Sequence, residues 1–482
     1  MESLSDTKWD VVISGTGLQN SLLALALSRS DKKILHVDQN DYYGGAEAAF
    51  SLQEVGEWVD KVQKDALQPF RNATLWKADS ENPESQKLSF SRAYTLTLSP
   101  QIIYTKSELL AQLVSSKVYR QLEFQAVGNW WIFAEGSLKR LPNGREDIFQ
   151  DKSIDNRAKR SLMKFLKFVV DYENQTETWE AHANDNLQNF LSSQFQFPPQ
   201  LQTVIAALTL SLDPPDNTTV RWALSRIARH LTSIGVFGPG FGAVFPKWGG
   251  GAEIAQVACR AGAVGGGVYV LGTGIQDVQN AEPRPEDEAT SSLSLSNGET
   301  VRTKRLIPGT KTTATSKNMT SKVIAVVSSS LNSIFMSSVE GSPLSAVSVV
   351  VFPPNTLSIE GSQLNPIYIM AHSSETGECP SSQSVLYAST SHREDSKLVL
   401  EGALSAFLKS VDDSEAQILY KLHYDQQESP DSSLDLAFDD QMLDAVEKQW
   451  KEIVGENDTA SFMQFEERNS MNADDDNDDD EY

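Results

Sequence analysis

A glycine-containing turn between two apolar runs constrains the fold of this chain more than any other feature. The stretch from Trp9 to Asp38 is WDVVISGTGLQNSLLALALSRSDKKILHVD. Residues 9–14 predict a buried strand, residues 18–30 a buried helix, and residues 34–37 a second strand. This order is typical of the opening βαβ unit of a dinucleotide-binding fold.

The turn itself departs from the dinucleotide fingerprint at one position. Gly15 and Gly17 supply the first two glycines, which let backbone amides approach a pyrophosphate at the start of the helix. The fingerprint has a third glycine where this chain has Asn20, and that glycine allows the helix and strand to pack closely. The pattern therefore indicates the fold, while the incomplete set of glycines leads us to expect a vestigial site without a cofactor.

Asp38 ends the second strand, 21 residues after Gly17, where the fingerprint has an acidic residue. Its carboxylate can bind the ribose of a dinucleotide. It can equally pair with Lys32 or Lys33, or cap the turn that follows.

No catalytic or metal-binding constellation is visible. Two cysteines, Cys259 and Cys379, are too few for a thiolate zinc site or a disulfide framework. The six histidines have no metal-ligand spacing, and neither a nucleophile elbow nor a phosphate-binding lysine loop occurs. The sequence predicts a protein without a catalytic role of its own and without a metal.

The formal net charge is −24, and seven of these charges lie between Asp474 and Glu481, which leaves −17 elsewhere. Such a surface repels nucleic acids and anionic lipid headgroups. It attracts a basic partner, or it simply keeps the protein in solution. The N-terminus resembles no secretory signal, no apolar run approaches the roughly 20 residues of a membrane span, and the C-terminus has no prenylation box. We expect a cytoplasmic protein without stable membrane anchoring.

Hydrophobic periodicity divides the chain into four parts. Residues 1–105 contain the βαβ unit, and residues 106–233 are predicted to form a separate all-helical domain inserted into the first. Residues 234–454 return to the first domain with several apolar strands and a final helix. Residues 455–482 are polar and acidic and are predicted to be disordered.

Two groups of charged residues are candidates for contact with another protein. Glu253 and Arg260 lie seven residues apart on a predicted helix, two turns along one face. A local ion pair would prefer a spacing of three or four, so both are available to a partner, or they are ordinary surface charges. Arg221, Arg226 and Arg229 form either a docking stripe or an exposed basic face.

Three stretches together resemble the family of Rab escort proteins and Rab GDP-dissociation inhibitors. They are residues 10–45, which end in DQNDYYGG, residues 96–124, which begin LTLSPQIIYTKSELL, and residues 245–271, FPKWGGGAEIAQVACRAGAVGGGVYVL. Their order and spacing match the family, and the resemblance covers most of residues 9–454. A flavin-dependent oxidoreductase, the weaker alternative, shares only the first stretch.

The resemblance implies an α/β fold with a flavoprotein-like, Rossmann-type domain I that contains β-sheet layers, and an all-helical domain II. It implies binding of GDP-form Rab GTPases, and of the geranylgeranyl lipid of the Rab among the helices of domain II. Matching the motifs places the Rab-binding platform at the following positions: Tyr42, Tyr43, Glu253, Arg260 and Val270.

Within the family, Phe50-Ser51 and Trp58 favour the escort branch over the dissociation inhibitors. An escort is the accessory subunit that presents Rab to the catalytic heterodimer of Rab geranylgeranyltransferase, and it touches membranes only transiently when it delivers Rab. The resemblance makes the helix that carries the three arginines and Leu231 the candidate surface for docking the transferase.

Overall fold

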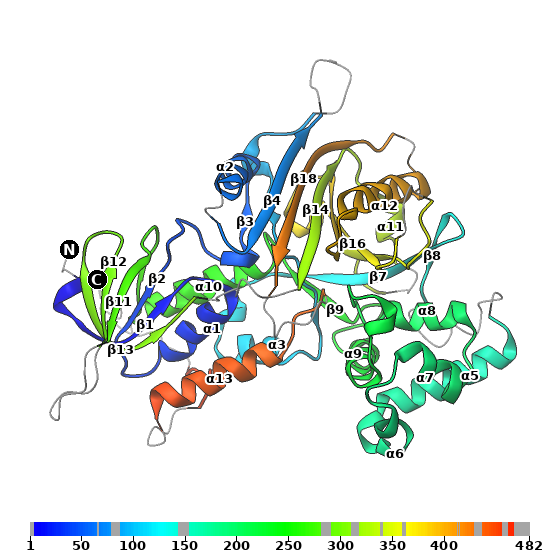
Figure 1. Ribbon diagram of the computed structural model, residues 1–482, viewed down its shortest axis with the longest axis horizontal. Coiled ribbons are helices and arrows are strands. Elements are labelled where there is room, and N and C mark those ends of the chain that lie inside the picture. Colours follow the sequence, from blue (N-terminus) through cyan, green and yellow to red (C-terminus); the bar gives the residue numbers. More distant parts are fainter. Residues whose placement is uncertain are drawn as a thin grey trace, which may run out of the picture.

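The structure is a computed structural model. It describes residues 4–64, 67–78, 87–142, 154–280, 291–309, 318–337, 341–358, 363–411, 413, 415–428, 436–455 and 461–466. A six-stranded sheet lies at one end, a larger sheet occupies the middle, and a group of helices lies at the other end (Figure 1). None of the helices in these ranges is long and apolar enough to cross a membrane.

The six-stranded sheet is built around the predicted βαβ unit, which is confirmed. In spatial order its strands are β10 (Val268–Val270), β2 (Ile34–Val37), β1 (Lys8–Ser14), β13 (Thr300–Ile307), β12 (Ser291–Leu295) and β11 (Ile275–Asn280). The first four are parallel to one another, whereas β12 and β11 are antiparallel additions.

Three helices lie together beside this sheet. They are α1 (Leu18–Leu27), α10 (Gly251–Val264) and α13 (Gln441–Val454), and α1 packs against both of the others. Helix α1 is buried around nearly its whole circumference, which explains why its sequence is leucine and alanine on every side. Val11 and Ile13 of β1 face this layer, and Trp9 and Val12 face a smaller cluster on the opposite side of the sheet.

The larger sheet has ten strands. In spatial order they are β4 (Phe70–Lys77), β18 (Ile418–Gln427), β14 (Met319–Val327), β17 (Ser384–Ser391), β16 (Ile367–Ser373), β15 (Val347–Phe352), β7 (Phe124–Ala134), β9 (Ala243–Pro246) and β6 (Ile103–Tyr104), with β8 (Ser137–Arg140) paired to β7. Helices α12 (Ser396–Ser410) and α11 (Asn332–Phe335) cover one face. Helix α2 (Leu52–Gln63) and a two-stranded ladder of β3 (Ala49–Phe50) and β5 (Leu96–Thr97) pack in the main core on the other.

The group of helices consists of α5 (Asn156–Val170), α6 (Thr176–Trp179), α7 (Leu187–Phe195), α8 (Pro199–Ala207) and α9 (Val220–Ser233). We call these five helices the helical cluster. Five phenylalanine rings fill its interior with centroid separations of 5.0–6.4 Å, and they belong to Phe165, Phe168, Phe190, Phe195 and Phe197.

The prediction that residues 106–233 are all-helical is wrong for their first part. Helix α3 (Glu108–Ser115) forms as expected, but it packs with α1 and α10 rather than with the helical cluster. Residues 124–134, FQAVGNWWIFA, form β7 in the interior of the larger sheet, paired with β15, β9 and β8. A mostly apolar strand that is flanked by strands on both sides is buried on both faces, and its sequence has no helical period.

The chain also packs beyond residue 455, where disorder is predicted. Met463 is buried in the core cluster beneath α1, and the rings of Trp450 and Phe462 are 5.7 Å apart. The guanidinium of Arg29 lies 5.2 Å from the ring centre of Phe465. Disorder is therefore wrong for residues 461–466, and the acidic run from Asp474 to Glu481 lies outside the described residues.

Candidate functional site

Hydrogen bonds join the glycine turn to the neighbouring strand ends. Gly15 has φ +85°, and its amide donates to the carbonyl of Val37 at 2.7 Å. Asn20, at the position of the missing glycine, donates from Nδ2 to the carbonyl of Ser14 at 2.9 Å and to that of Pro308 at 3.4 Å. The asparagine thus joins the end of β1 to the segment after β13, so its side chain is used by the fold.

Asp38 is used in the same way. Its Oδ2 accepts hydrogen bonds from the Thr16 amide at 2.6 Å and from the Thr16 hydroxyl at 2.7 Å. Its Oδ1 accepts from the Asn40 amide at 2.9 Å. Of the roles open to this carboxylate, the structure shows the capping of the following turn, and it adds a bond across the glycine turn.

The segment after β2 lies over the glycine turn. Gly44 donates to the carbonyl of Thr16 at 3.1 Å, and a Cβ added to Gly45 would lie 3.4 Å from the Cα of Gly17. The Glu47 carboxylate accepts a hydrogen bond from the amide of Leu18, the first residue of α1, at 3.3 Å. Burial raises the pKa of this carboxyl, and the bond from Leu18 opposes the shift.

These contacts do not fit a bound dinucleotide. The fold places a pyrophosphate at the start of α1, where this chain places a carboxylate of its own. The acid that would bind a ribose is already bonded to Thr16. A second anion next to Glu47 would be repelled, so we derive no chemistry through a flavin or nicotinamide.

Residues of α10 and of the loop after β2 form an exposed, charged surface. Glu253, Gln256 and Arg260 follow one another at helical spacings of three and four along α10, where Gln256 and Arg260 are exposed and Glu253 is half-buried. Burial raises the pKa of Glu253, and the Arg260 guanidinium opposes this. Burial also raises the pKa of Tyr43, which Arg260 again opposes. We call the surface of Tyr43, Glu253, Gln256 and Arg260 the α10 face.

Two predicted platform residues lie elsewhere. Tyr42 turns inward and packs edge-on against Phe50, with ring centres 4.8 Å apart, and burial raises its pKa. Val270 packs with the cluster that contains Trp9 and Val12, on the side of the six-stranded sheet opposite α1 and α10. The structure therefore brings together Tyr43, Glu253 and Arg260, but it separates Tyr42 and Val270 from them.

The arginines of α9 are largely used within the chain. The guanidinium of Arg226 lies 3.9 Å from the ring centre of Trp222 and 3.7 Å from an oxygen of Asp439. Arg229 donates to the carbonyl of Phe438 at 2.9 Å and lies over the ring of Tyr104.

The other two predicted docking residues differ in exposure. Leu231 packs against the main core cluster. Arg221 is the exposed member of the predicted docking set, with its guanidinium 5.4 Å from the ring centre of Trp179. Of the predicted set, only this arginine is fully exposed, and the other three are partly buried.

One serine, histidine and aspartate meet at an end of the larger sheet. Ser321 Oγ lies 2.8 Å from His392 Nδ1 and donates to Asp425 Oδ1 at 2.6 Å, and the same Nδ1 lies 3.2 Å from that oxygen. A hydrolase triad uses both ring nitrogens, one for the serine and one for the aspartate. Here one nitrogen serves both, so the arrangement is not a nucleophilic triad. The described ranges also hold no group of three or more residues placed to bind a metal ion.

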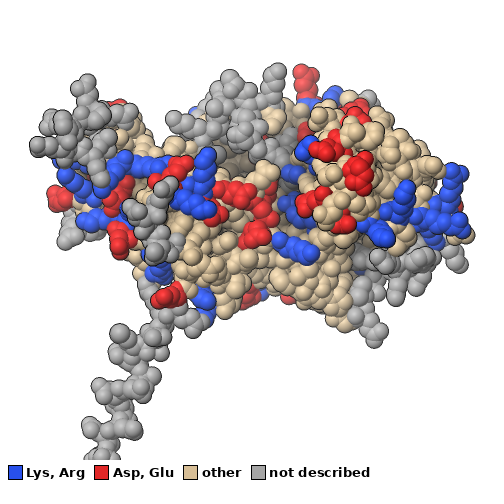
Figure 2. Space-filling model, turned by 90° about the horizontal axis from the view of Figure 1, so that it is seen from below, with Lys and Arg blue, Asp and Glu red and all other residues tan. Residues whose placement is uncertain are grey.

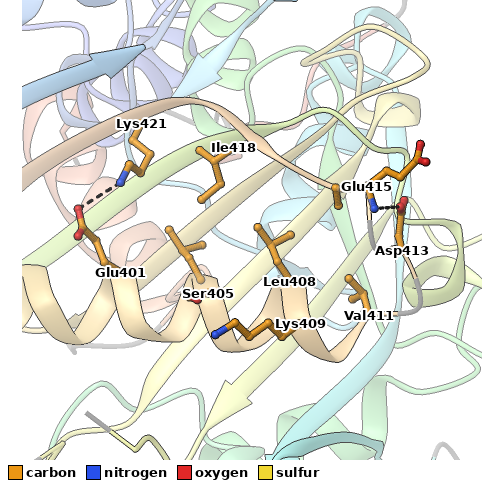
Figure 3. Close-up of a pocket in the computed structure, with 11 residues that line it drawn as sticks. Glu401, Ser405, Leu408, Lys409, Val411, Asp413, Glu415, Ile418 and Lys421 are labelled. Atoms are coloured by element: carbon orange, nitrogen blue, oxygen red, sulfur yellow. Dashed lines mark hydrogen bonds and ion pairs between the residues drawn. The ribbon is translucent and has the colours of Figure 1, made fainter. Parts of the chain in front are cut away.

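A groove of about 970 Å³ lies between α12 and the start of β18, away from all predicted site residues. Figure 3 shows its lining, with Lys421 paired to Glu401 at one end and the Glu415 amide bonded to Asp413 at the other. On the underside of the molecule, acidic and basic side chains are interspersed (Figure 2). The groove does not contribute to the α10 face.

Glu47, Thr16 and Gln256 are the residues that sequence reasoning missed. Thr16 and Glu47 act through partners that are close in space, and no local pattern marks them. Gln256 was detectable, because it occupies the position between Glu253 and Arg260 on the same helix face.

Comparison with known proteins identifies relatives of similar sequence. A yeast protein from Saccharomyces cerevisiae, named Rab proteins geranylgeranyltransferase component A, is 32% identical over 401 residues, or 83% of this chain. This chain spans 64% of that relative's length.

Solved structures share the fold. The crystal structure of Rab GDI from Plasmodium falciparum matches with a TM-score of 0.63 at 18% identity, covering 92% of this chain and 97% of that one. An oxidoreductase from Methanosarcina mazei matches with a TM-score of 0.53 at 12% identity, covering 88% and 90%. These likenesses concern the fold alone. The family model described as GDP dissociation inhibitor matches residues 5–440, and the chain therefore belongs to the GDP dissociation inhibitor family.

Proposed function

We propose that this chain is a Rab escort protein, the accessory component that presents GDP-bound Rab GTPases to the catalytic heterodimer of Rab geranylgeranyltransferase. The observation that carries the proposal is the 32% identity to a protein named as component A of that enzyme. The absence of a usable triad or metal group among the described residues is compatible with a role in which another subunit performs the chemistry.

In this proposal the α10 face binds the folded GTPase. An aromatic ring, a carboxylate and a guanidinium at the surface of α10 and the adjoining loop suit a polar protein surface. A flexible Rab tail offers an enzyme little to recognise. Binding the GTPase domain instead raises the effective concentration of that tail at the active site.

The helical cluster is the proposed site for the lipid after transfer. A geranylgeranyl chain in water costs about 0.8 kcal/mol per methylene, so an apolar environment stabilises the product. Phenylalanine rings fill the interior of the cluster, so admitting the lipid requires these helices to separate. Arg221 is the proposed point of contact with the transferase. The complex acts in the cytoplasm and meets membranes only on delivery.

The test is Rab prenylation by the catalytic heterodimer, with and without this chain. We expect transfer of the geranylgeranyl group to depend on the chain and to saturate with its concentration. Equal rates without the chain would contradict the escort role.

A GDP-dissociation inhibitor is the second candidate, favoured by the description of the family model. Such an inhibitor would bind prenylated Rab much more tightly than unprenylated Rab. Tight binding of unprenylated Rab by this chain would favour the escort, and weak binding together with extraction of Rab from membranes would favour the inhibitor.

A further inference from the structure

Glu47 stands at the start of two helices that both lack a side-chain cap. Helix α1 begins after Gly17 and helix α10 begins after Gly250, and neither glycine can accept a hydrogen bond through a side chain. The first amides of a helix need acceptors and carry a partial positive charge. The Glu47 carboxylate supplies one acceptor, since it bonds the amide of Leu18 at 3.3 Å.

The stem of Glu47 packs against the first turn of α10. A Cβ added to Gly251 would lie 3.2 Å from the Cβ of Glu47 and 3.3 Å from its Cγ. Any side chain at position 251 would therefore push the glutamate away or displace the helix. A single residue thus contacts the starts of α1 and α10 at once.

The same residue fixes the loop that carries Tyr43. The amide of Glu47 donates to the carbonyl of Gly44 at 2.9 Å, and Gly44 is bonded in turn to Thr16 at 3.1 Å. Tyr43 is adjacent to Gly44, and Glu253 lies two residues after Gly251. The two parts of the α10 face, one from a loop and one from a helix, are therefore joined through Glu47.

We propose that Glu47 is a positioning residue for the α10 face, which holds the loop of Tyr43 and the start of α10 in one fixed arrangement. The inference rests on the proposed function, in which that face binds Rab. Glu47 is itself half-buried and acts through its neighbours. A preformed surface avoids the entropy cost of ordering a loop on binding, so a loosened loop weakens affinity without removing a contact.

The experiment measures the affinity of the full chain for GDP-bound Rab by titration. We expect Glu47→Ala to weaken binding about tenfold, because the loop loses its attachment to both helices. Glu47→Gln keeps an acceptor for Leu18 and a similar volume, so it should retain affinity close to wild type. Gly251→Ala keeps the glutamate in the sequence but adds a methyl that crowds its stem, and it should weaken binding in the same way as Glu47→Ala.

Two matched controls come from α2. Gly56→Ala adds a methyl where no atom lies within 4 Å, and Glu57→Gln removes an exposed carboxylate. Both should bind Rab like the wild type. Gly251→Ala also keeps the test open if Glu47→Ala fails to fold.

Wild-type affinity in Glu47→Ala or in Gly251→Ala would overturn the proposal. Equal weakening in Glu47→Ala and Glu47→Gln would also overturn it, because the charge would then act directly on Rab. Glu253→Ala and Arg260→Ala, measured in parallel, distinguish a failure of the proposed function of the α10 face from a failure of the positioning role of Glu47. If these variants bind normally, the role of the α10 face fails. If they weaken binding and Glu47→Ala does not, only the positioning role fails.

Discussion

Glu253 and Arg260 show what residue spacing can predict about a binding surface and what it cannot. Their separation of seven predicts one face of a helix, and α10 confirms that both lie on it. Tyr43 joins them from a loop near the N-terminus, and the neighbouring Gly44 approaches α10 so closely that an added Cβ would lie 3.3 Å from the Cα of Ala252. No spacing in the sequence relates Tyr43 to α10, because the loop after β2 and α10 are far apart in the chain and meet only in the folded protein, where the stem of Glu47 packs against Gly251.

Truncation of the α10 face tests its role directly. We expect Glu253→Ala and Arg260→Ala each to weaken binding of GDP-bound Rab by roughly 1–2 kcal/mol, as for a central interface residue. Isothermal titration with each variant measures this. Glu108→Ala on α3 and Lys167→Ala on α5 remove exposed charges elsewhere and should change nothing. Unchanged affinity in both α10 variants would exclude this face from the interface.

His230 is a buried residue that makes stability depend on pH. Its ring packs edge-on against Trp130 at 4.6 Å, and its Nδ1 lies 3.3 Å from the Tyr104 hydroxyl. Burial, together with the charge of the neighbouring Arg229, lowers the pKa of His230 to about 4. The unfolded chain takes up this proton near pH 6.5, whereas the folded chain does so only near pH 4.

Between these two values the unfolded state binds more protons, so the free energy of unfolding must fall as the pH falls. We expect the wild type to lose up to about 3 kcal/mol from this group between pH 7 and pH 4. His230→Gln should lose correspondingly less over the same range. Urea denaturation across that range measures both slopes, and equal slopes would show that His230 is not the group responsible.

At the scale of single elements, α9 separates two uses of arginine. The sequence shows only that several arginines share a helix with Trp222 and Leu224. The structure ties Arg226 and Arg229 to Phe438 and Asp439, which precede α13. Helical periodicity cannot predict a contact with a residue more than two hundred positions away. Arginines that dock another protein and arginines that bind within the chain therefore have the same sequence pattern.

This difference predicts opposite phenotypes for two arginines of α9. Arg229→Ala should lower the free energy of unfolding by about 1–3 kcal/mol, because it removes a charged hydrogen bond and a cation–π contact. Arg221→Ala loses only an exposed contact with Trp179, so it should change stability by no more than about 1 kcal/mol, but it should weaken binding to the catalytic heterodimer. Urea denaturation and a titration with the heterodimer distinguish the two. A destabilised Arg221→Ala, or full transferase affinity in that variant, would contradict its docking role.

Strand β7 shows why the boundary of the helical part could not be placed from sequence. Most of its residues are apolar and buried, and a short run of this kind suits a buried strand or a buried helix equally. The decision came from its neighbours β15 and β9, which are contributed by much later parts of the chain. Helix α5, by contrast, has a strong amphipathic period and an Asp155 cap, and it forms as predicted.

At the scale of the whole molecule, the fold resembles that of an oxidoreductase from Methanosarcina mazei, with a TM-score of 0.53. The charges placed around the glycine turn of this chain nevertheless do not fit a dinucleotide. Asp38 is bonded to Thr16, and Glu47 lies at the start of α1, so the phosphate position already holds a negative charge.

We therefore expect the purified protein to show no saturable binding of FAD. In a titration with FAD at micromolar concentrations, the flavin fluorescence should change no more than it does when albumin, a control protein, replaces this chain. The reason is that the Glu47 carboxylate, which already lies at the start of α1, would repel the pyrophosphate. A yellow protein, or stoichiometric quenching of flavin fluorescence, would contradict this reading of the turn.

Local sequence patterns were enough to predict the βαβ unit, most helices of the helical cluster, and the face shared by Glu253 and Arg260. Each depends on a period or a turn within a few tens of consecutive residues, and such signals are local. The packed fold was needed to show that Glu47 lies at the start of α1, that Tyr43 belongs to the α10 face and Tyr42 does not, and that Arg226 and Arg229 bind within the chain. These outcomes depend on contacts between distant segments, whose energies are fixed only when the two sheets and the helices have packed.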